Sequence, residues 1–192
     1  MALLNPIFGS LGDNVQREAR KVLREQHLLN DDFPANEINS ALAEAGKSPD
    51  FDDYAIERFL KIEYRTRTSL LALSLLYDEN SWGMLSFQQD HIFPKSLFTV
   101  DYMTEAGIES EKQTRFLNLF NRVGNLELLL DAENAAKSNK DFADWLPTRD
   151  STFRQRHLIP DDDSVLEFTM FEEFIEAREA LIKDRLQCLL DL

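Results

Sequence analysis

Two adjacent side chains, Asp90 and His91, carry the clearest chemical potential in this sequence, within the segment DHIFPKS. A carboxylate is a hard oxygen ligand suited to Mg²⁺ or Mn²⁺. Histidine can accept a proton near neutral pH because its ordinary pKa is about 6.5. Adjacent side chains on a regular strand point to opposite faces, so both can serve one site only if the strand ends or distorts here. Pro94 supplies that ending.

A second group of candidates lies about forty residues downstream, in the segment GNLELLLDAENAAK. Asn134 falls in the first turn of a predicted helix that Asp131 can cap, and its amide oxygen can join Asp90 on a metal without adding negative charge. The same turn offers backbone N–H groups and the positive end of the helix dipole to a phosphate. Lys137 lies three residues further along the same side of the helix, within reach of that phosphate.

Two short strands and a helix must position these groups. Residues 84–89 are the first strand candidate. In residues 125–130, the alternation of leucines predicts a second strand that is buried mainly on one face. A helix is expected from about Ala132 to Trp145, where Pro147 ends it. The order is strand, long insertion, strand and helix.

Helices are predicted on both sides of this centre. They cover about residues 13–28, 36–45 and 52–64, and the segment TRTSLLALSLLY is apolar nearly all round, which predicts a buried helix. Thr169 and Glu172 form a predicted capping box for a long C-terminal helix. The expected fold is therefore α+β and mainly helical. We divide it into a helical region (1–80), a ββα core (81–147) and a loop with a long helix (148–192), together one compact unit.

The bulk composition limits the classes of function. The 192 residues include 21 Lys and Arg and 35 Asp and Glu, which gives a net charge of −14. This charge argues against a protein that coats nucleic acid by bulk electrostatic attraction. The net charge does not exclude a nuclease, because bound metal ions add positive charge that is not included in the amino-acid composition. The single cysteine fits a reducing cytosol, and no apolar run approaches the roughly 18 residues of a membrane span. We therefore expect a cytoplasmic protein with no membrane partner.

Taken in order, the central motifs resemble the HNH, or His-Me finger, nucleases, whose core is a ββα-metal unit. The closest likeness is to the HNH domain at the C-terminal end of GmrSD-type modification-dependent restriction and phage-defence proteins. The pattern there is roughly D-H-I-x-P-x-S, then G-N-L-x-L-L, then E-N-x-x-K. The resemblance runs from about Arg65 to Trp145 and extends more loosely to HLIP and the last helix. Each motif alone is weak, whereas the ordered set is specific.

The resemblance implies a role for each candidate residue. His91 would be the general base that activates the attacking water. Asp90 and Asn134 would hold one Mg²⁺ or Mn²⁺ ion. Asn125 would brace the loop that carries His91, although a turn-stabilising asparagine without a catalytic part is an open alternative.

Two cations are expected to meet nucleic acid. By the same resemblance, Lys137 would contact a phosphate. Lys95 can touch phosphate or help to cap the next segment.

The resulting hypothesis is a metal-dependent endonuclease that hydrolyses phosphodiester bonds in DNA, nicking one strand per site, in restriction or antiviral defence. The alternatives are a non-catalytic nucleic-acid-binding or interaction module with the same fold, and an RNA-cleaving toxin. GmrSD-type proteins usually carry a large N-terminal nucleotide-hydrolysing domain, and its signature residues are absent here. We therefore expect a fragment or stand-alone relative, partnered by such a domain or by a separate subunit.

Overall fold

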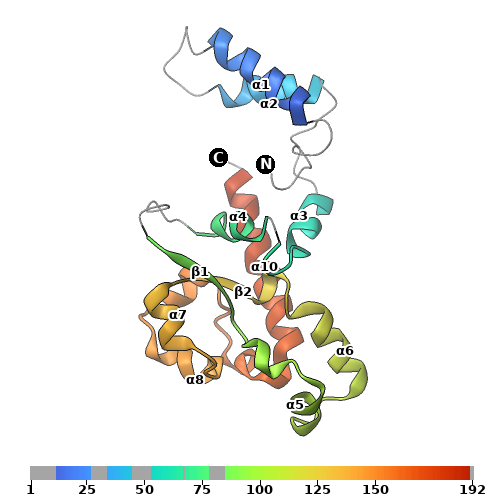
Figure 1. The fold of residues 1–192 in the computed structure, drawn as a ribbon, viewed down its shortest axis with the longest axis vertical. Coiled ribbons are helices and arrows are strands. Elements are labelled where there is room, and N and C mark those ends of the chain that lie inside the picture. Colours follow the sequence, from blue (N-terminus) through green and yellow to red (C-terminus); the bar gives the residue numbers. More distant parts are fainter. Residues whose placement is uncertain (1–11, 27–33, 45–52, 67, 78–84, 191–192) are drawn as a thin grey trace. The chain divides into compact units, whose positions relative to one another are not determined.

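A computed structural model describes residues 12–26, 34–44, 53–66, 68–77 and 85–190 (Figure 1). The chain divides into two compact units, Met1–Arg58 and Phe59–Leu192, with the boundary inside helix α3 (Asp53–Leu60). Among the helices of the described ranges, none combines the length and the apolar character needed to cross a membrane.

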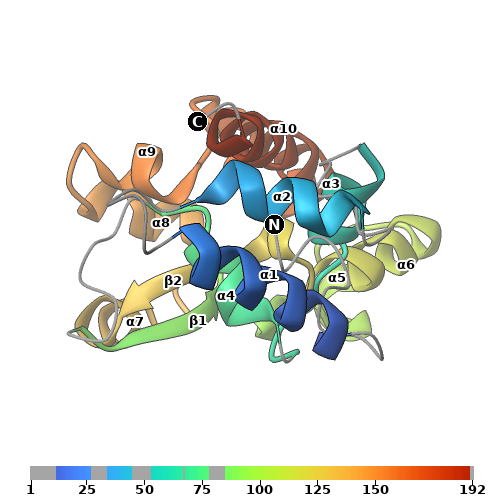
Figure 2. The same cartoon turned by 90° about the horizontal axis from the view of Figure 1, so that it is seen from above.

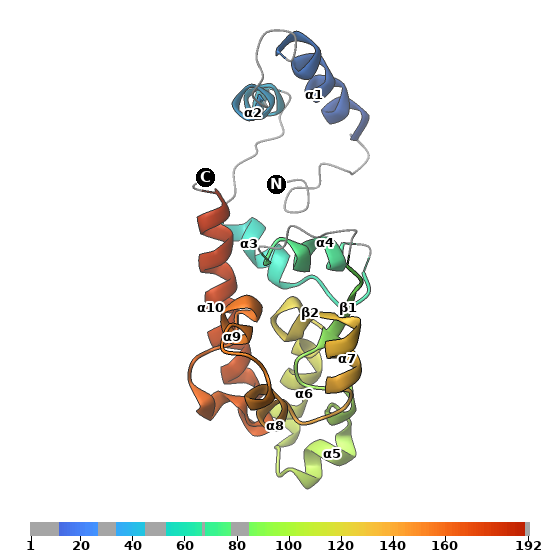
Figure 3. The same cartoon turned by 90° about the vertical axis from the view of Figure 1, so that its left-hand side faces the viewer.

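The first unit contains a pair of helices, α1 (Gly12–Gln26) and α2 (Ala35–Glu44), close to their predicted bounds. They pack against each other and lie side by side in Figure 3. Ala19, Val22 and Leu23 are half-buried and fall on one face of α1, as helical spacing requires. The predicted helix ends at residues 27–28 and 45 lie outside the described residues.

The second unit holds a two-stranded antiparallel sheet of β1 (Phe87–His91) and β2 (Leu126–Leu130), which confirms the mainly helical α+β prediction (Figure 2). Asp90 pairs with Glu127, and His91 pairs with Leu126. The first strand starts three residues later than predicted, so Asp90 and His91 are its last residues. The expectation that β2 is buried mainly on one face is wrong, because four consecutive residues, 126–129, are buried.

Helix α7 (Asp131–Lys137) packs against both strands and completes a ββα arrangement. The predicted continuous helix to Trp145 is wrong. Ser138 adopts a positive φ of 49°, and a separate helix, α8 (Phe142–Trp145), begins after it. Asp141 accepts a hydrogen bond from the Ala143 N–H (2.9 Å), so this side chain caps the new helix.

The other elements of this unit surround the sheet. They are α4 (Ser69–Ser74), η1 (Lys95–Leu97), α5 (Val100–Glu105), α6 (Ser110–Leu119), η2 (Val123–Asn125), η3 (Leu146–Thr148), α9 (Phe153–His157), η4 (Asp163–Leu166), η5 (Phe168–Met170) and α10 (Phe171–Leu190). The predicted buried helix corresponds to α4, which is shorter and leaves Leu70 and Leu71 exposed. The predicted capping box of α10 does not form, because the Glu172 carboxylate instead accepts from Arg115 Nε at 2.6 Å.

An aromatic cluster forms the core of the unit, with Phe93 at its centre. The Phe93 ring is fully buried, and its centroid lies 4.9 Å from that of Phe174 and 5.3 Å from that of Phe171, both on α10. Phe142 of α8 and Phe168 of η5 pack against the same ring. Because Phe93 follows His91 by two residues, the core fixes the end of β1.

We expect Phe93→Ala to lower the free energy of unfolding by about 3–5 kcal/mol, because it leaves a cavity among rings that cannot collapse fully. The control is Leu117→Ala on α6, where the side chain is 40% exposed and little packing is lost. Urea denaturation of both variants measures the difference. Similar losses in the two variants would contradict the placement of Phe93.

Candidate functional site

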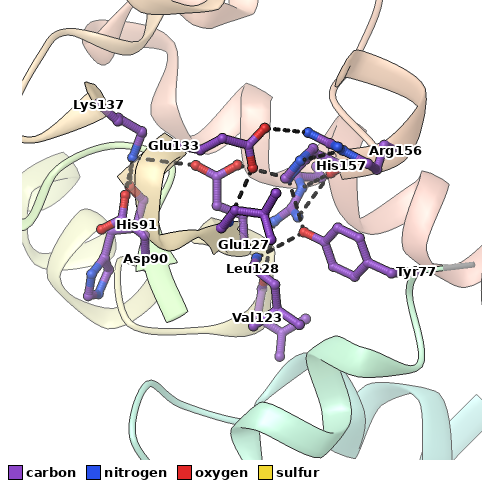
Figure 4. Close-up of polar contacts among 12 residues, drawn as sticks. Tyr77, Asp90, His91, Val123, Glu127, Leu128, Glu133, Lys137, Arg156 and His157 are labelled. Carbon is purple, nitrogen blue, oxygen red and sulfur yellow. Dashed lines mark hydrogen bonds and ion pairs between the residues drawn. The ribbon is translucent and has the colours of Figure 1, made fainter. Parts of the chain in front are cut away.

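The two neighbouring candidates, Asp90 and His91, point to opposite sides of β1. The Asp90 side chain is 25% exposed and contacts Lys137, whereas the imidazole of His91 points away from Lys137 (Figure 4). The ring is buried between Tyr64, at a centroid distance of 4.4 Å, and Phe120, at 6.1 Å. The strand alternation therefore persists up to the last residue of β1, and the distortion that would turn both side chains toward one site is not present in this arrangement.

His91 is held as a neutral imidazole. Its Nε2 lies 3.0 Å from Asn121 Oδ1, so Nε2 carries the hydrogen and donates to the amide oxygen. Burial lowers the pKa of His91, although the hydrogen bond to Asn121 and the charge of Asp90 oppose this. Nδ1 has no hydrogen-bond partner within the described ranges, so its lone pair is available to accept a proton. Asn121 is not among the residues predicted from the sequence.

Asn125 ties the segment that follows His91 to the C-terminal end of α6. Its side chain is fully buried, and Oδ1 accepts from the Phe93 N–H at 2.9 Å. Nδ2 donates to the carbonyl oxygens of Phe93 (3.3 Å) and Phe120 (2.9 Å). These are the contacts that a brace for the loop after His91 requires, while a part in catalysis stays a prediction.

Lys137 does not present its charge to solvent. Its side chain is fully buried, and Nζ donates to Asp90 Oδ2 and to the backbone oxygen of His91. Nζ also lies 3.4 Å from Glu127 Oε1. The expected phosphate contact is therefore corrected: this ammonium is a buried counter-ion between two carboxylates. Burial of such a charge requires this pairing.

Glu127, which the sequence analysis placed on the less buried face of β2, is fully buried. Its Oε2 lies 3.0 Å from His157 Nδ1 of α9. His157 Nε2 accepts from Arg156 Nε (3.1 Å), so Nδ1 carries the hydrogen that faces Glu127. Tyr77 Oη lies 3.1 Å from the same Nδ1 and accepts from the Leu128 N–H (Figure 4). A buried polar network thus runs from α9 through β2 to Asp90.

The charge of Glu127 is stabilised despite its burial. Burial raises the pKa of this carboxyl, but the nearby N–H of His157 and the charges of Lys137 and Arg178 outweigh it, and the net pKa is lowered. Neither Glu127 oxygen has a well-aligned donor among the described residues, so electrostatic attraction carries these contacts. Arg178 of α10 donates to the backbone oxygen of His157 (3.2 Å from Nε) and to that of Gly124 (2.8 Å from Nη1).

The N terminus of α7 is not the phosphate site that the sequence analysis expected. Glu133 Oε2 accepts the Leu130 N–H at 3.1 Å, and Glu133 Oε1 pairs with Arg156 at 2.7 Å. Asp131 adds a second carboxylate to this first turn and accepts from Gln88 Nε2 (3.1 Å) rather than capping the helix. The turn is therefore acidic, with one backbone donor already satisfied.

The residues proposed for a metal offer few ligands. No group of three His, Cys, Asp or Glu side chains within the described ranges could hold an ion. Asp90 Oδ1 has no hydrogen-bond partner there, and Asn134 is half-buried with no side-chain bond to Asp90. Mg²⁺ keeps several waters and needs few protein ligands, so two oxygen donors suit Mg²⁺ or Mn²⁺ and do not fit a closed Zn²⁺ site. Lys95, the second predicted phosphate contact, is exposed in η1.

We expect Glu127→Gln to lower the free energy of unfolding by about 3–5 kcal/mol at pH 7, because it leaves the buried Lys137 without one of its two counter-charges. The folded-state pKa of Glu127 lies below its ordinary value of 4.5, so the charge stabilises the fold above that pH. The contribution is lost as pH falls from 4.5 through the folded-state value. Urea denaturation from pH 7 to pH 4 should show the difference from wild type shrinking in acid.

The matched control is Glu176→Gln, an exposed position on α10. It should stay within about 0.5 kcal/mol of wild type at every pH. A loss for Glu127→Gln no larger than this would contradict a buried ionised carboxylate.

Residues 37–184 match the family of the C-terminal domain of GmrSD restriction endonucleases. The match spans more than half of the chain and includes every candidate residue of the site. No curated protein matches the chain. The chain therefore belongs to the GmrSD C-terminal domain family, which carries the HNH nuclease domain and points to a nuclease of the restriction-endonuclease type.

Proposed function

We propose that this chain is a metal-dependent HNH endonuclease that nicks DNA in restriction or antiviral defence. The observation that carries the proposal is the state of His91. Its imidazole is neutral, Nε2 is held by Asn121, and Nδ1 has no hydrogen-bond partner among the described residues. A neutral, oriented imidazole is what a general base requires.

In the proposed reaction, His91 Nδ1 takes a proton from a water as the water oxygen attacks phosphorus. The bond from phosphorus to the 3′ oxygen breaks, and that oxygen leaves with a proton from solvent. Asn121 keeps the ring oriented, and Asn125 holds the following backbone. A divalent ion held by Asp90 and Asn134 would supply positive charge to the phosphate and to the leaving oxygen. Because Asp90 and the imidazole of His91 point to opposite sides of β1 (Figure 4), the two groups can act on one phosphate only if the end of β1 rearranges when metal and DNA bind.

One observation favours a second candidate, a nucleic-acid-binding or interaction module without turnover. Lys137 already neutralises Asp90, so a metal must share or displace this contact. Plasmid nicking with Mg²⁺ or Mn²⁺, with and without EDTA, separates the two candidates. Offering tRNA in parallel tests the RNA-cleaving alternative.

We expect His91→Ala and His91→Gln each to slow nicking by about 10²-fold or more, because neither side chain can take the proton. The glutamine variant retains an amide that can form a hydrogen bond with Asn121 and fills much of the space of the ring. Its rate therefore reports the loss of the base with less loss of packing than in the alanine variant. The alanine variant also loses stability because the ring is buried. Rates are therefore compared well below each thermal midpoint, and a wild-type rate in either variant would remove His91 from the mechanism.

The metal ligands can be tested without any activity measurement. Asp90→Asn and Asn134→Ala should each weaken Mn²⁺ affinity in calorimetry, with the charged ligand mattering more. The control is Asp131→Ala, an exposed carboxylate in the same ββα region, which should leave affinity unchanged. Unchanged affinity in either test variant, or a loss in the control, would show that the ligand set is wrong.

A further inference from the structure

The proposed function requires an acidic chain to hold a polyanion, and several of the cations in residues 59–192 are poorly placed to do so. Lys137 is buried, and several others already contact carboxylates. The pairs are Lys112 with Glu173, Arg115 with Glu111 and Glu172, Arg154 with Asp163, and Arg156 with Glu133. A paired cation is close to neutral when seen from a few ångströms away. These side chains therefore add little attraction for a phosphate chain.

Helix α1 differs from this pattern. Four of its residues lie at positions i, i+3, i+4 and i+7, so they share one face of the helix. All four are exposed: Arg17, Arg20, Lys21 and Arg24. Helix α1 packs against α2, and its apolar residues Ala19, Val22 and Leu23 are half-buried, whereas the basic face is exposed. Gln16 and Glu25 lie beside these basic side chains on the helix surface.

Few charges of this basic face are compensated by the residues that the structure describes. Within the described ranges, only Arg17 of the four forms an ion pair, with Glu18 at 3.3 Å. Arg17 is 70% exposed in that pair, so the pair is weak and readily exchanged. Glu25 brings one carboxylate to the end of the face. Helix α1 holds four basic and three acidic residues, a net charge of +1 in a chain of −14.

The size and chemistry of the basic face suit a nucleic-acid backbone. Seven residues of helix span about 10.5 Å at about 1.5 Å per residue. That length corresponds to about three steps of about 3.4 Å along one DNA strand. Three of the four cations are arginines, whose planar guanidinium matches phosphate oxygens. Salt-dependent phosphate contact needs no recognition of bases.

We propose that the basic face of α1 binds the phosphate backbone of the DNA substrate without reading its sequence. The inference rests on the proposed function for the identity of the polyanion, but not on His91 or on a metal. Helix α1 precedes the matched residues 37–184, so this contact lies outside the region that defines the family match.

The test uses the full chain and a labelled duplex of about 20 base pairs, with anisotropy measured at several salt concentrations in EDTA. Four phosphate contacts predict a slope of log K against log salt of about −3.6. Arg20→Gln/Lys21→Gln should flatten this slope by about 1.8 and weaken binding equally for unrelated sequences. EDTA prevents cutting and removes any contribution from a metal.

A matched pair of single variants distinguishes the effect of a charge on α1 from the effect of the net charge of the chain on DNA binding. Lys21 and Lys183 are both exposed helical lysines, and each change to Gln alters the net charge by the same amount. Lys21→Gln should flatten the slope by about 0.9, and Lys183→Gln should leave it unchanged. Equal thermal midpoints for both variants and wild type establish that each is folded.

Three results would overturn the inference. They are an unchanged slope in the double variant, equal effects of Lys21→Gln and Lys183→Gln, and binding to phosphatidylserine vesicles but not to the duplex. Plasmid nicking in Mg²⁺ keeps the two proposals apart. If the chain nicks DNA but the α1 variants leave the salt slope of binding unchanged, only the inference about α1 is wrong. If the chain binds the duplex through α1 but never cuts it, only the proposed catalysis is wrong.

Discussion

The buried ammonium of Lys137 is the interaction on which the geometry of the site depends. It connects α7 to both strands, because it donates to Asp90 and to the backbone of His91 and lies against Glu127. An unpaired charge at full burial would cost several kcal/mol, so the three elements must stay together for the cation to be tolerated. The same contact fixes the carboxylate of Asp90 and limits what else can bind it. The ion pair with Lys137 and the binding of a metal therefore compete for the same carboxylate of Asp90.

The position of His91 depends on a different set of forces. Asn125 forms hydrogen bonds with both backbone groups of Phe93 and with the backbone oxygen of Phe120, and the Phe93 ring packs into the aromatic core against α10. The imidazole then fits between Tyr64 and Phe120, where burial keeps it neutral. A base with a depressed pKa is more often unprotonated at neutral pH, although each such base is intrinsically weaker. Packing therefore sets the protonation state that the proposed chemistry requires.

Sequence patterns predicted the ββα order and the positions of the candidate residues, because turn residues and leucine alternation are local signals. They failed where tertiary contacts decide the outcome. Glu127 alternates with leucines like an exposed strand residue, yet His157 and Lys137, distant in sequence, make its burial tolerable. Lys137 likewise has the spacing of a surface lysine. Glu172 suits a capping box, but the guanidinium of Arg115 is a stronger partner than a backbone N–H.

The buried charges around Lys137 and the exposed charges of α1 respond differently to added salt. The Asp90–Lys137–Glu127 contacts are shielded from solvent, so added salt screens them little. Exposed cations such as those of α1 act over about one Debye length, roughly 8 Å at physiological ionic strength. Mobile counter-ions compete for those exposed charges but cannot reach Lys137. Consequently, salt can weaken the hold on a polyanion while the arrangement of Asp90 and His91 stays intact, so affinity and site geometry can vary independently in this chain.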